Sequence, residues 1–380
     1  MEDTTMKENS KLKTQNSKLK KILIRCPNWI GDVMLSIPSI SAVREAFPSA
    51  HISTLIKSNL SPLLEGNPDI NEIIPFNPDL MSIPERLKFY RSFKEKNFDL
   101  AILLTNSFES ALSVFLAGIK NRVGFNKDMR GIFLTEKIPM PSRKSPRMHQ
   151  AEYYLTLIEG ISIDSKLGVP TRVGRQNLKL KTYMSIPEDI QMGVNKFWLE
   201  KGLTKRHYII GMNIGASYGY AKRWMPERFT ELADMIYSEA EASHYNVEVV
   251  LFGGNDDLNI EREIKGRMKH KALSIVGKAT LKSLAAWIKR CHLFITNDSG
   301  PMHIAAAVGT PIVAIFGSTD PSETSPLCSN YTIVRKSVDC SPCWKRKCPT
   351  DHRCMELIEV SDVMDAVKEM LGSHRLNPLP

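Results

Sequence analysis

The stretch KILIRCPNWIGDVMLSIPSISAVREAF, residues 21–47, decides the fold. Its apolar run at 21–26 breaks at Pro27 and Gly31 and leads into a segment whose apolar residues suit a buried helix, in spite of Pro38. The stretch therefore predicts a strand, a loop and a helix. Strands that alternate with helices are joined by crossover connections, so the fold class indicated is α/β with a mostly parallel sheet.

The same alternation fills the first half of the chain. Strands are predicted at 51–56, 70–76 and 98–104, and helices from about residue 60 and at 84–96. We interpret 122–150, which is rich in Arg, Lys, Gly and Pro, as a long loop lining a site. A doubly wound α/β domain is expected over 21–175.

The second half repeats the pattern after a helix near 149–161 and a linker at 176–190. Strands are predicted at 207–215, 246–254, 272–277, 292–297 and 310–317, and helices at 226–241, 257–268, 281–290 and from residue 300. A second doubly wound domain is thus expected over 191–372, and a length of 380 residues suits two cores. Two Rossmann-like domains facing across a cleft are the architecture of GT-B glycosyltransferases, but other two-domain α/β proteins share this outline.

Composition narrows the function classes. The chain is 42% hydrophobic and 24% charged, as in ordinary globular proteins, and carries a net charge of +10. That charge favours nucleic acid, an anionic membrane surface or a phosphorylated substrate as partner. Nucleic acid is not expected, because no basic stripe interleaved with aromatics is present.

The N-terminal residues lack the apolar stretch of a signal peptide. Residues 1–20 contain five lysines and no apolar run, so we expect a disordered basic tail, with a second tail at 373–380. No apolar stretch approaches the roughly 18 residues that span a bilayer. We therefore expect a cytoplasmic protein.

Polar motifs follow the predicted strands, where ligands of open α/β sheets bind. In CPNWIGD (26–32), Asp32 is either a helix N-cap or a general base. In GASYGYAKRWMPERF (215–229), glycines, a helix start and Lys222 suit a diphosphate, whereas the alternative is a surface loop with a solvated lysine. The P-loop and the G-x-G-x-x-G motif after the first strand are both absent, which disfavours P-loop NTPases and dehydrogenases.

A third motif is TNDSGPMHIAAAVGTPIVAIFG (296–317). It places Asp298, Ser299 and Gly300 at the end of a strand and the start of a small-residue helix, which again suits an anion. His303 is either an ordinary helix histidine or a donor to a phosphate.

Four of the seven cysteines lie close together in the sequence. They are Cys340, Cys343, Cys348 and Cys354, within a loop at 340–354. Four thiolates can hold a structural zinc, but the gap between the two ligand pairs is shorter than usual. A compact reduced loop or a redox-sensitive loop is the favoured interpretation, so no metal site is predicted.

With these motifs in view, the chain resembles the ADP-heptose:lipopolysaccharide heptosyltransferases, most closely the type II members. The matching segments are RCPNWIGDVMLSIPSI, RVGFNKDMRGIFLT, GASYGYAKRWMPERFTELA, NDSGPMHIAAAVGTPIVAIFGSTDP and CSPCWKRKCPTDHRCM, which span about residues 21–370. PNWIGD and GASYGYAKRW are specific to this type, while DSGPMH is shared across the wider family.

The resemblance implies roles for individual residues. It makes Asp32 the catalytic base and Lys222 the main contact to the donor phosphates. The other implied donor contacts are Ser217, Asp257 near the ribose, Asp298, Ser299, Gly300 and His303. The implied acceptor contacts are Asn28, Trp29, Arg122, Lys127 and Arg130.

The implied activity is inverting transfer of heptose from ADP-L-glycero-β-D-manno-heptose to the first heptose of the lipopolysaccharide inner core. The partners implied are this donor, an anionic lipid A-core glycolipid and, transiently, the inner-membrane surface. No cofactor is expected. The alternatives are a heptosyltransferase with another acceptor and a catalytically silent nucleotide-sugar binding protein.

Overall fold

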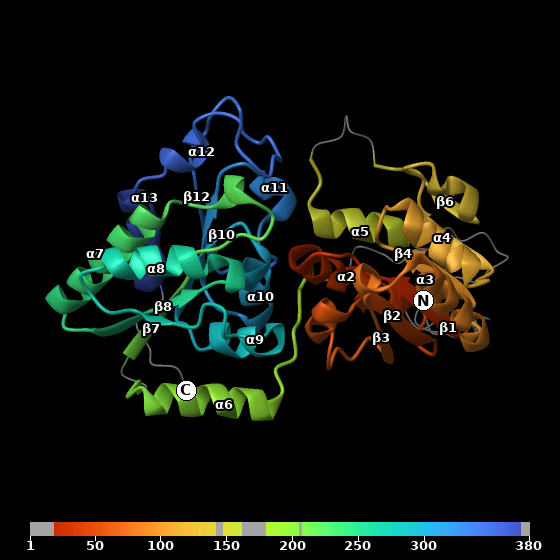
Figure 1. Cartoon of the computed structure of the whole chain (residues 1–380), viewed down its shortest axis with the longest axis horizontal. Helices are drawn as coiled ribbons and strands as arrows, with labels where there is room; N and C mark the ends of the chain where they lie inside the picture. Colours follow the sequence, from red (N-terminus) through yellow and green to blue (C-terminus); the bar gives the residue numbers. More distant parts are fainter. Residues whose placement is uncertain (1–18, 142–146, 162–179, 205–206, 374–380) are drawn as a thin grey trace, which may run out of the picture. The chain divides into compact units, whose positions relative to one another are not determined.

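The computed structural model describes residues 19–141, 147–161, 180–204 and 207–373. The chain divides into two compact units, Met1–Leu180 and Lys181–Pro380 (Figure 1). The division falls inside the 176–190 segment predicted as a linker. In the described residues, no helix is both long and apolar enough to cross a membrane.

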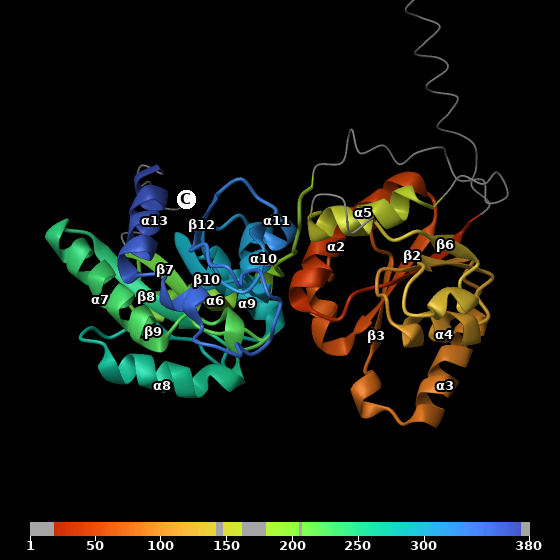
Figure 2. The same ribbon diagram turned by 90° about the horizontal axis from the view of Figure 1, so that it is seen from above.

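The N-terminal unit contains a six-stranded sheet in the order β3-β2-β1-β4-β5-β6, with every neighbouring pair parallel. Its strands are β1 (Lys21–Arg25), β2 (His51–Lys57), β3 (Glu72–Phe76), β4 (Leu100–Leu103), β5 (Asn121–Phe125) and β6 (Glu136–Ile138). Its α-helices are α2 (Ile30–Ala46), α3 (Ile83–Ser92), α4 (Phe108–Leu116) and α5 (Gln150–Glu159). Helices α2 and α5 pack together on one side of the sheet, and α3 and α4 pack together on the other (Figure 2).

The C-terminal unit repeats this plan. Its sheet has the order β12-β11-β10-β7-β8-β9, again all parallel. Its strands are β7 (His207–Asn213), β8 (Asn246–Phe252), β9 (Leu273–Ser274), β10 (Leu293–Asn297), β11 (Ile312–Phe316) and β12 (Tyr331–Arg335). Its α-helices are α6 (Glu188–Glu200), α7 (Pro226–Ala242), α8 (Leu258–Arg267), α9 (Leu281–Lys289), α10 (Gly300–Val308), α11 (Pro321–Thr324), α12 (Arg353–Glu356) and α13 (Val360–Ser373).

Both sheets follow the Rossmann-type strand order, which confirms the prediction of two doubly wound α/β domains. The order reverses between β1 and β4 in one unit and between β7 and β10 in the other. Ligands of such sheets bind outside the carboxyl ends of the strands at this reversal. Each unit therefore has one preferred place for a site.

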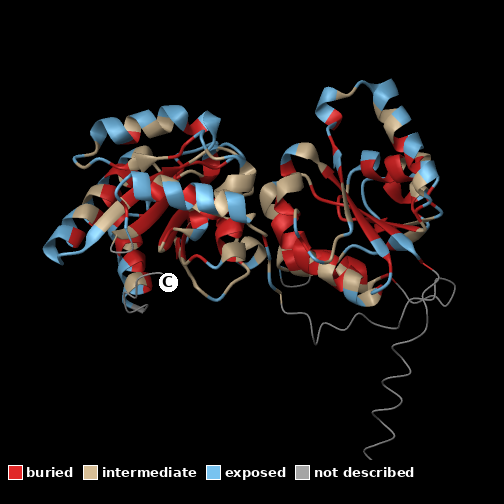
Figure 3. Ribbon diagram, turned by 90° about the horizontal axis from the view of Figure 1, so that it is seen from below, coloured by how far each residue is buried: buried red, intermediate tan, exposed pale blue. Residues whose placement is uncertain are grey.

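Burial explains why these segments fold as they do. The strands at the centre of each sheet are buried on both faces, whereas the helices expose one side (Figure 3). Helix α2 tolerates Pro38 because the surrounding turns pack tightly: ten of its residues are buried, from Val33 to Val43. A doubly covered parallel strand is a near-continuous apolar run, which is the pattern read from the sequence.

One sequence interpretation was wrong. The segment 122–150 is not one long loop, because it includes most of β5, the 3-10 turn η5 (Arg130–Phe133) and β6. Both strands pair in parallel with their neighbours. They are short and interrupted by charged residues and glycine, so their hydrophobic pattern is weak.

Candidate functional site

The C-terminal unit holds a buried ion pair at the reversal point of its sheet. The ammonium group of Lys222, at the end of the 3-10 turn η6 (Tyr220–Lys222), lies 2.5 Å from the Oδ2 atom of Asp298. The hydroxyl of Thr319 donates to the same oxygen at 2.6 Å. Lys222 is 8% exposed and Asp298 2% exposed, so this cation works where the dielectric is low.

Two asparagine side chains attach the surrounding loops to the strand ends. Asn297, the last residue of β10, accepts a hydrogen bond from the Trp224 backbone N–H at 3.0 Å. Asn213, the last residue of β7, donates to the hydroxyl of Ser299 at 2.9 Å. The loop that carries Lys222 and the start of α10 are thereby held at the same edge of the sheet.

Helix α10 begins at this edge. Ser299 is its N-cap residue and makes no side-chain cap bond, and Gly300 is its first residue. The first backbone N–H groups of a helix lack intrahelical acceptors and favour an anion. His303 is buried within the first turns. The predicted residues Lys222, Asp298, Ser299 and Gly300 are thus brought together.

Asp257 and Ser217 are placed differently. Asp257 is 7% exposed; it accepts from the Gly254 N–H at 2.9 Å and lies 3.1 Å from Arg223. A Cβ atom on Gly215 would lie 2.0 Å from this carboxylate, which explains the glycine. Asp257 therefore orients Arg223 beside Lys222, and its ribose contact stays a prediction. Ser217 is exposed on the loop after β7.

In the N-terminal unit, Asp32 lies in the first turn of α2 and is half-buried. The N-cap of α2 is Trp29, so the interpretation of Asp32 as an N-cap is wrong. Tyr154, which is buried on α5, interacts with this carboxylate: burial and then the charge of Asp32 raise the pKa of the Tyr154 hydroxyl well above its ordinary value. The Tyr154 phenol therefore stays protonated beside Asp32, and the role of Asp32 as a base stays a prediction.

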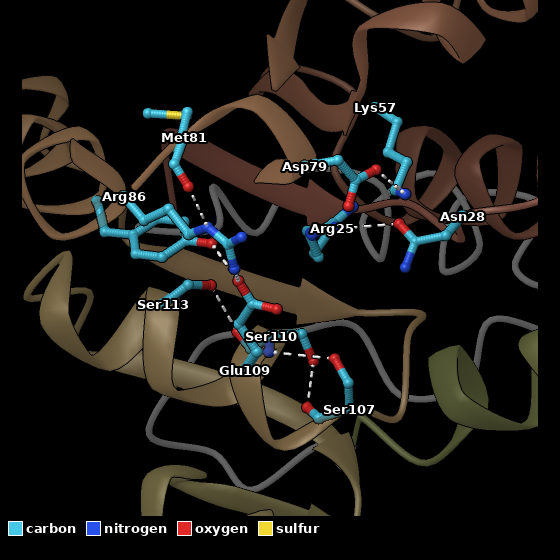
Figure 4. A network of polar contacts seen from close by, with 11 residues as sticks. Arg25, Asn28, Lys57, Asp79, Met81, Arg86, Ser107, Glu109, Ser110 and Ser113 are labelled. Atoms are coloured by element: carbon cyan, nitrogen blue, oxygen red, sulfur yellow. Dashed lines mark hydrogen bonds and ion pairs between the residues drawn. The ribbon is translucent and has the colours of Figure 1, made fainter. Parts of the chain in front are cut away.

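Asn28 is held by a buried arginine that the sequence analysis did not single out. Arg25, at the end of β1, donates to the Asn28 side-chain oxygen at 3.1 Å and to the carbonyls of Cys26 and Leu55 (Figure 4). Burial lowers the pKa of the Arg25 guanidinium. Trp29, which follows Asn28 in the chain, is 46% exposed. The carboxyl end of β1 thus presents a fixed amide and an accessible aromatic ring.

Two further cations lie near Arg25 (Figure 4). Lys57, the last residue of β2, pairs with Asp79 at 2.8 Å, and Arg86 pairs with Glu109 at 3.3 Å. Lys57 directly follows the predicted strand at 51–56, so its place at a strand end was the available signal.

The three basic residues predicted as acceptor contacts differ in their exposure to solvent. Lys127 is exposed, as an acceptor contact requires. Arg122 is half-buried and donates to the carbonyls of Phe133, Ile119 and Lys120. Arg130 is 0% exposed, so it is not presented at the surface, and its contact with an acceptor stays a prediction. Its guanidinium donates to the Phe125 carbonyl at the end of β5 and to Thr105 and Asn106, which follow β4.

All four clustered cysteines are reduced in the described chain: Cys340 is exposed, Cys343 and Cys348 are intermediate and Cys354 is buried. No group of three or more metal-ligating side chains, within the part of the chain that the structure describes, is placed to hold a metal ion. Burial and the neighbouring thiols of Cys340, Cys343 and Cys348 raise the pKa of Cys354 to about 11, so the four side chains lie near one another, and the zinc interpretation stays an untested alternative.

The family assignment follows from comparison with known proteins. The model of glycosyltransferase family 9 (heptosyltransferase) matches residues 86–353. The chain belongs to this family. This family 9 enzyme is 30% identical over 331 residues to lipopolysaccharide heptosyltransferase 2 of Escherichia coli, covering 83% of this chain and 88% of the relative. It is also 30% identical to lipooligosaccharide heptosyltransferase 2 of Haemophilus influenzae, with the same coverage.

Solved structures agree with this assignment. The Escherichia coli ADP-heptose lipopolysaccharide heptosyltransferase II superposes with a TM-score of 0.75 at 28% identity, covering 93% of the family 9 chain and 99% of that structure. A family 9 glycosyltransferase from Veillonella parvula gives a TM-score of 0.79 at 26% identity, covering 95% and 99%. The predicted GT-B-like fold class and glycosyltransferase activity are confirmed.

Proposed function

We propose that this enzyme transfers heptose from ADP-L-glycero-β-D-manno-heptose to the first heptose of the lipopolysaccharide inner core and releases ADP. One observation carries the proposal: the buried Lys222–Asp298 pair lies at the start of α10, at the reversal point of a Rossmann-like sheet. This is a diphosphate site built without a P-loop. The relatives named heptosyltransferase 2 support heptose and the inner core as the substrate classes.

The reaction is a single displacement. An acceptor hydroxyl oxygen forms a bond to the anomeric carbon of the heptose, and the bond from that carbon to the β-phosphate oxygen breaks. Asp32 takes the hydroxyl proton, and the electron pair leaves with ADP. One displacement from the face opposite the leaving group inverts the configuration and needs one base.

The C-terminal unit stabilises the leaving group. Negative charge develops on the β-phosphate as ADP departs, and Lys222 and the first N–H groups of α10 supply fixed positive charge to it. Lys222 can turn from Asp298 to the phosphate, while Thr319 continues to donate to the carboxylate. We therefore propose a metal-independent reaction, in which EDTA leaves the rate unchanged.

The proposed partners follow from charge. An anionic lipid A-core acceptor fits a protein of net charge +10 with Lys127 exposed and Asn28 presented at the end of β1. Transient contact with the cytoplasmic face of the inner membrane would bring the enzyme to this glycolipid.

The deciding experiment measures ADP release from ADP-heptose with acceptors that carry zero, one or two heptoses. Transfer to the one-heptose acceptor alone is expected, in the presence of EDTA as in its absence. Transfer only to the heptose-free core or to another glycan would reassign the acceptor, and hydrolysis or binding without transfer would refute the enzyme. Activity lost with EDTA and restored by magnesium would refute the metal-independent step.

A further inference from the structure

The Cys-rich segment, residues 340–354, packs against the loop that carries Lys222. We call residues 215–224 the donor loop. The Tyr218 hydroxyl donates to the Trp344 carbonyl at 2.7 Å, and the Ala221 N–H donates to the Arg346 carbonyl at 3.1 Å. The two segments lie more than a hundred residues apart in the chain, so these bonds are tertiary.

His352, near the end of the Cys-rich segment, also contacts the donor loop. Its Nε2 atom lies 3.1 Å from the Ala221 carbonyl oxygen, and its ring packs at a tilt against Tyr220 with 4.9 Å between ring centroids. A carbonyl only accepts, so Nε2 carries the proton and donates. His352 is 5% exposed, which makes the loss of this bond costly.

The fit is close enough to fix the residue type at Gly219. A Cβ atom there would lie 2.3 Å from the Arg346 carbonyl oxygen. The donor loop therefore touches the backbone of the Cys-rich segment directly, with no side chain between them.

The same segment also contacts the loop that carries Thr319. The N–H groups of Cys343 and Trp344 both donate to the Ser318 carbonyl at 3.0 Å. Ser318 precedes Thr319, whose hydroxyl binds Asp298. The Cys-rich segment is thus bonded to two of the three loops that supply the buried Lys222–Asp298–Thr319 cluster, those that carry Lys222 and Thr319.

Tyr218 links this contact to the charge of the site. Two cations lie over its ring: the Lys222 ammonium is 4.8 Å from the ring centroid and the Arg346 guanidinium carbon is 5.5 Å from it. Cation–π attraction to the Tyr218 ring therefore restrains Lys222 in addition to its ion pair with Asp298. The position of the Tyr218 ring, set by its bond to Trp344, therefore helps to set the position of Lys222.

We propose that the Cys-rich segment is a template that holds the donor loop in its diphosphate-binding conformation, with Tyr218 and His352 as positioning residues. This inference rests on the proposed function, because it assigns the donor loop to ADP. The donor loop would bind the nucleoside diphosphate part of the donor. Changes in the Cys-rich segment should therefore alter donor binding and leave acceptor binding unchanged. Neither residue need touch the reacting atoms.

The test uses Tyr218→Phe, which removes the hydroxyl but keeps the ring beside Lys222. We expect the dissociation constant for ADP and the KM for ADP-heptose to rise about tenfold, the loss of about one hydrogen bond. The KM for the acceptor should not change. His352→Leu should give the same pattern, and His352→Gln, whose amide can still donate, should recover part of the affinity.

Tyr237→Phe is the matched control. The Tyr237 hydroxyl binds the Val249 N–H and the Lys271 carbonyl in the same unit, on α7 and away from the donor loop. This variant should lower the melting temperature as Tyr218→Phe does, and leave ADP affinity unchanged. A purely structural role for Tyr218 predicts identical behaviour of the two variants.

Wild-type ADP affinity in folded Tyr218→Phe and His352→Leu would overturn the template role. Calorimetric titration with ADP alone separates this inference from the acceptor assignment. If wild-type protein binds ADP but fails to transfer heptose to the core, the proposed function fails while the titration still decides the template role. If wild-type protein does not bind ADP, both fail.

Discussion

The two units bury a cation in opposite ways. Arg130 in the N-terminal unit is 0% exposed and donates to the carbonyls of Phe125 and Thr105 and to the Asn106 side chain. Lys222 in the C-terminal unit is 8% exposed and pairs with the carboxylate of Asp298. Uncharged oxygens surround the first, and an ionised partner balances the second.

The difference separates a structural cation from a binding cation. The five fixed donors of an arginine can join several carbonyls at once, and burial lowers the pKa of Arg130 only to about 10, so it stays charged. A lysine is a compact charge on a flexible stem that can exchange one oxygen partner for another. We infer that Arg130 stabilises its fold, whereas Lys222 is held ready for a phosphate.

The largest effect is expected from removing the Lys222 charge. Lys222→Met should lower kcat/KM about a thousandfold, because the leaving phosphate loses its main cation. It should also destabilise the unit by about 3–5 kcal/mol, because Asp298 is left charged and buried. Steady-state ADP release and chemical unfolding measure the two effects.

The double variant Lys222→Met with Asp298→Asn is the control. Removing both charges should restore most of the stability and none of the activity. If activity returned together with stability, Lys222 would be a structural cation like Arg130, and the proposed difference between the two residues would be wrong.

Arg130→Met should show the reverse pattern. The carbonyls and the amide that its guanidinium joins lose their donors, so we expect the free energy of unfolding to fall by about 3 kcal/mol. The kcat and KM of the folded fraction should stay within a factor of two of wild type. A selective rise in the KM for the acceptor, without loss of stability, would return Arg130 to the acceptor site.

His292 offers a third way to bury a basic group, which is to keep it neutral. Its Nδ1 atom accepts from the Ile209 N–H at 3.0 Å, and burial lowers its pKa to about 4. The folded pKa lies below the unfolded value of about 6.5, so this group makes stability fall as pH drops from 6.5 towards 4. We expect a loss of about 1–2 kcal/mol after allowing for solvent screening.

Chemical unfolding between pH 7 and pH 4 checks this window. His292→Asn keeps an acceptor for the Ile209 N–H but cannot titrate, so its stability should vary less over that range. Equal pH dependence in both proteins would show that other groups cause it.

The smallest effect is expected at the exposed Lys127. Lys127→Ala should raise the KM for an anionic acceptor about twofold at low salt, and the difference should vanish near 0.5 M salt. Its stability should equal that of wild type. A loss that persists at high salt would indicate a close, desolvated contact instead.

The sequence predicted the centre of each sheet better than its edges. Central strands such as β1 and β10 are uninterrupted apolar runs because helices cover both of their faces. The strands β5, β6 and β12 were missed; β6 is EKI, with two charged residues among three, and β5 contains Arg122 and Gly124. Helix α13 was missed as well, although its apolar residues join the core of the C-terminal unit.

Some residues of the candidate site could be predicted from the sequence and others could not. Motif position found Lys222, Asp298 and Ser299, because residues that follow neighbouring parallel strands meet at one edge. It missed Thr319 and His352, whose roles depend on loops that meet only in three dimensions. It did not predict the burial of Arg130, because the sequence of a basic, glycine-containing segment does not distinguish a buried arginine from an exposed one.

The most direct test of the account is ADP titration and heptose transfer in Asp32→Asn beside Lys222→Met. We assign the catalytic base, Asp32, to the N-terminal unit and donor binding, by Lys222, to the C-terminal unit. Asp32→Asn should therefore bind ADP as wild type does while transfer falls about a thousandfold, and Lys222→Met should lose ADP affinity as well. Full transfer by Asp32→Asn, or wild-type ADP affinity in Lys222→Met, would contradict it.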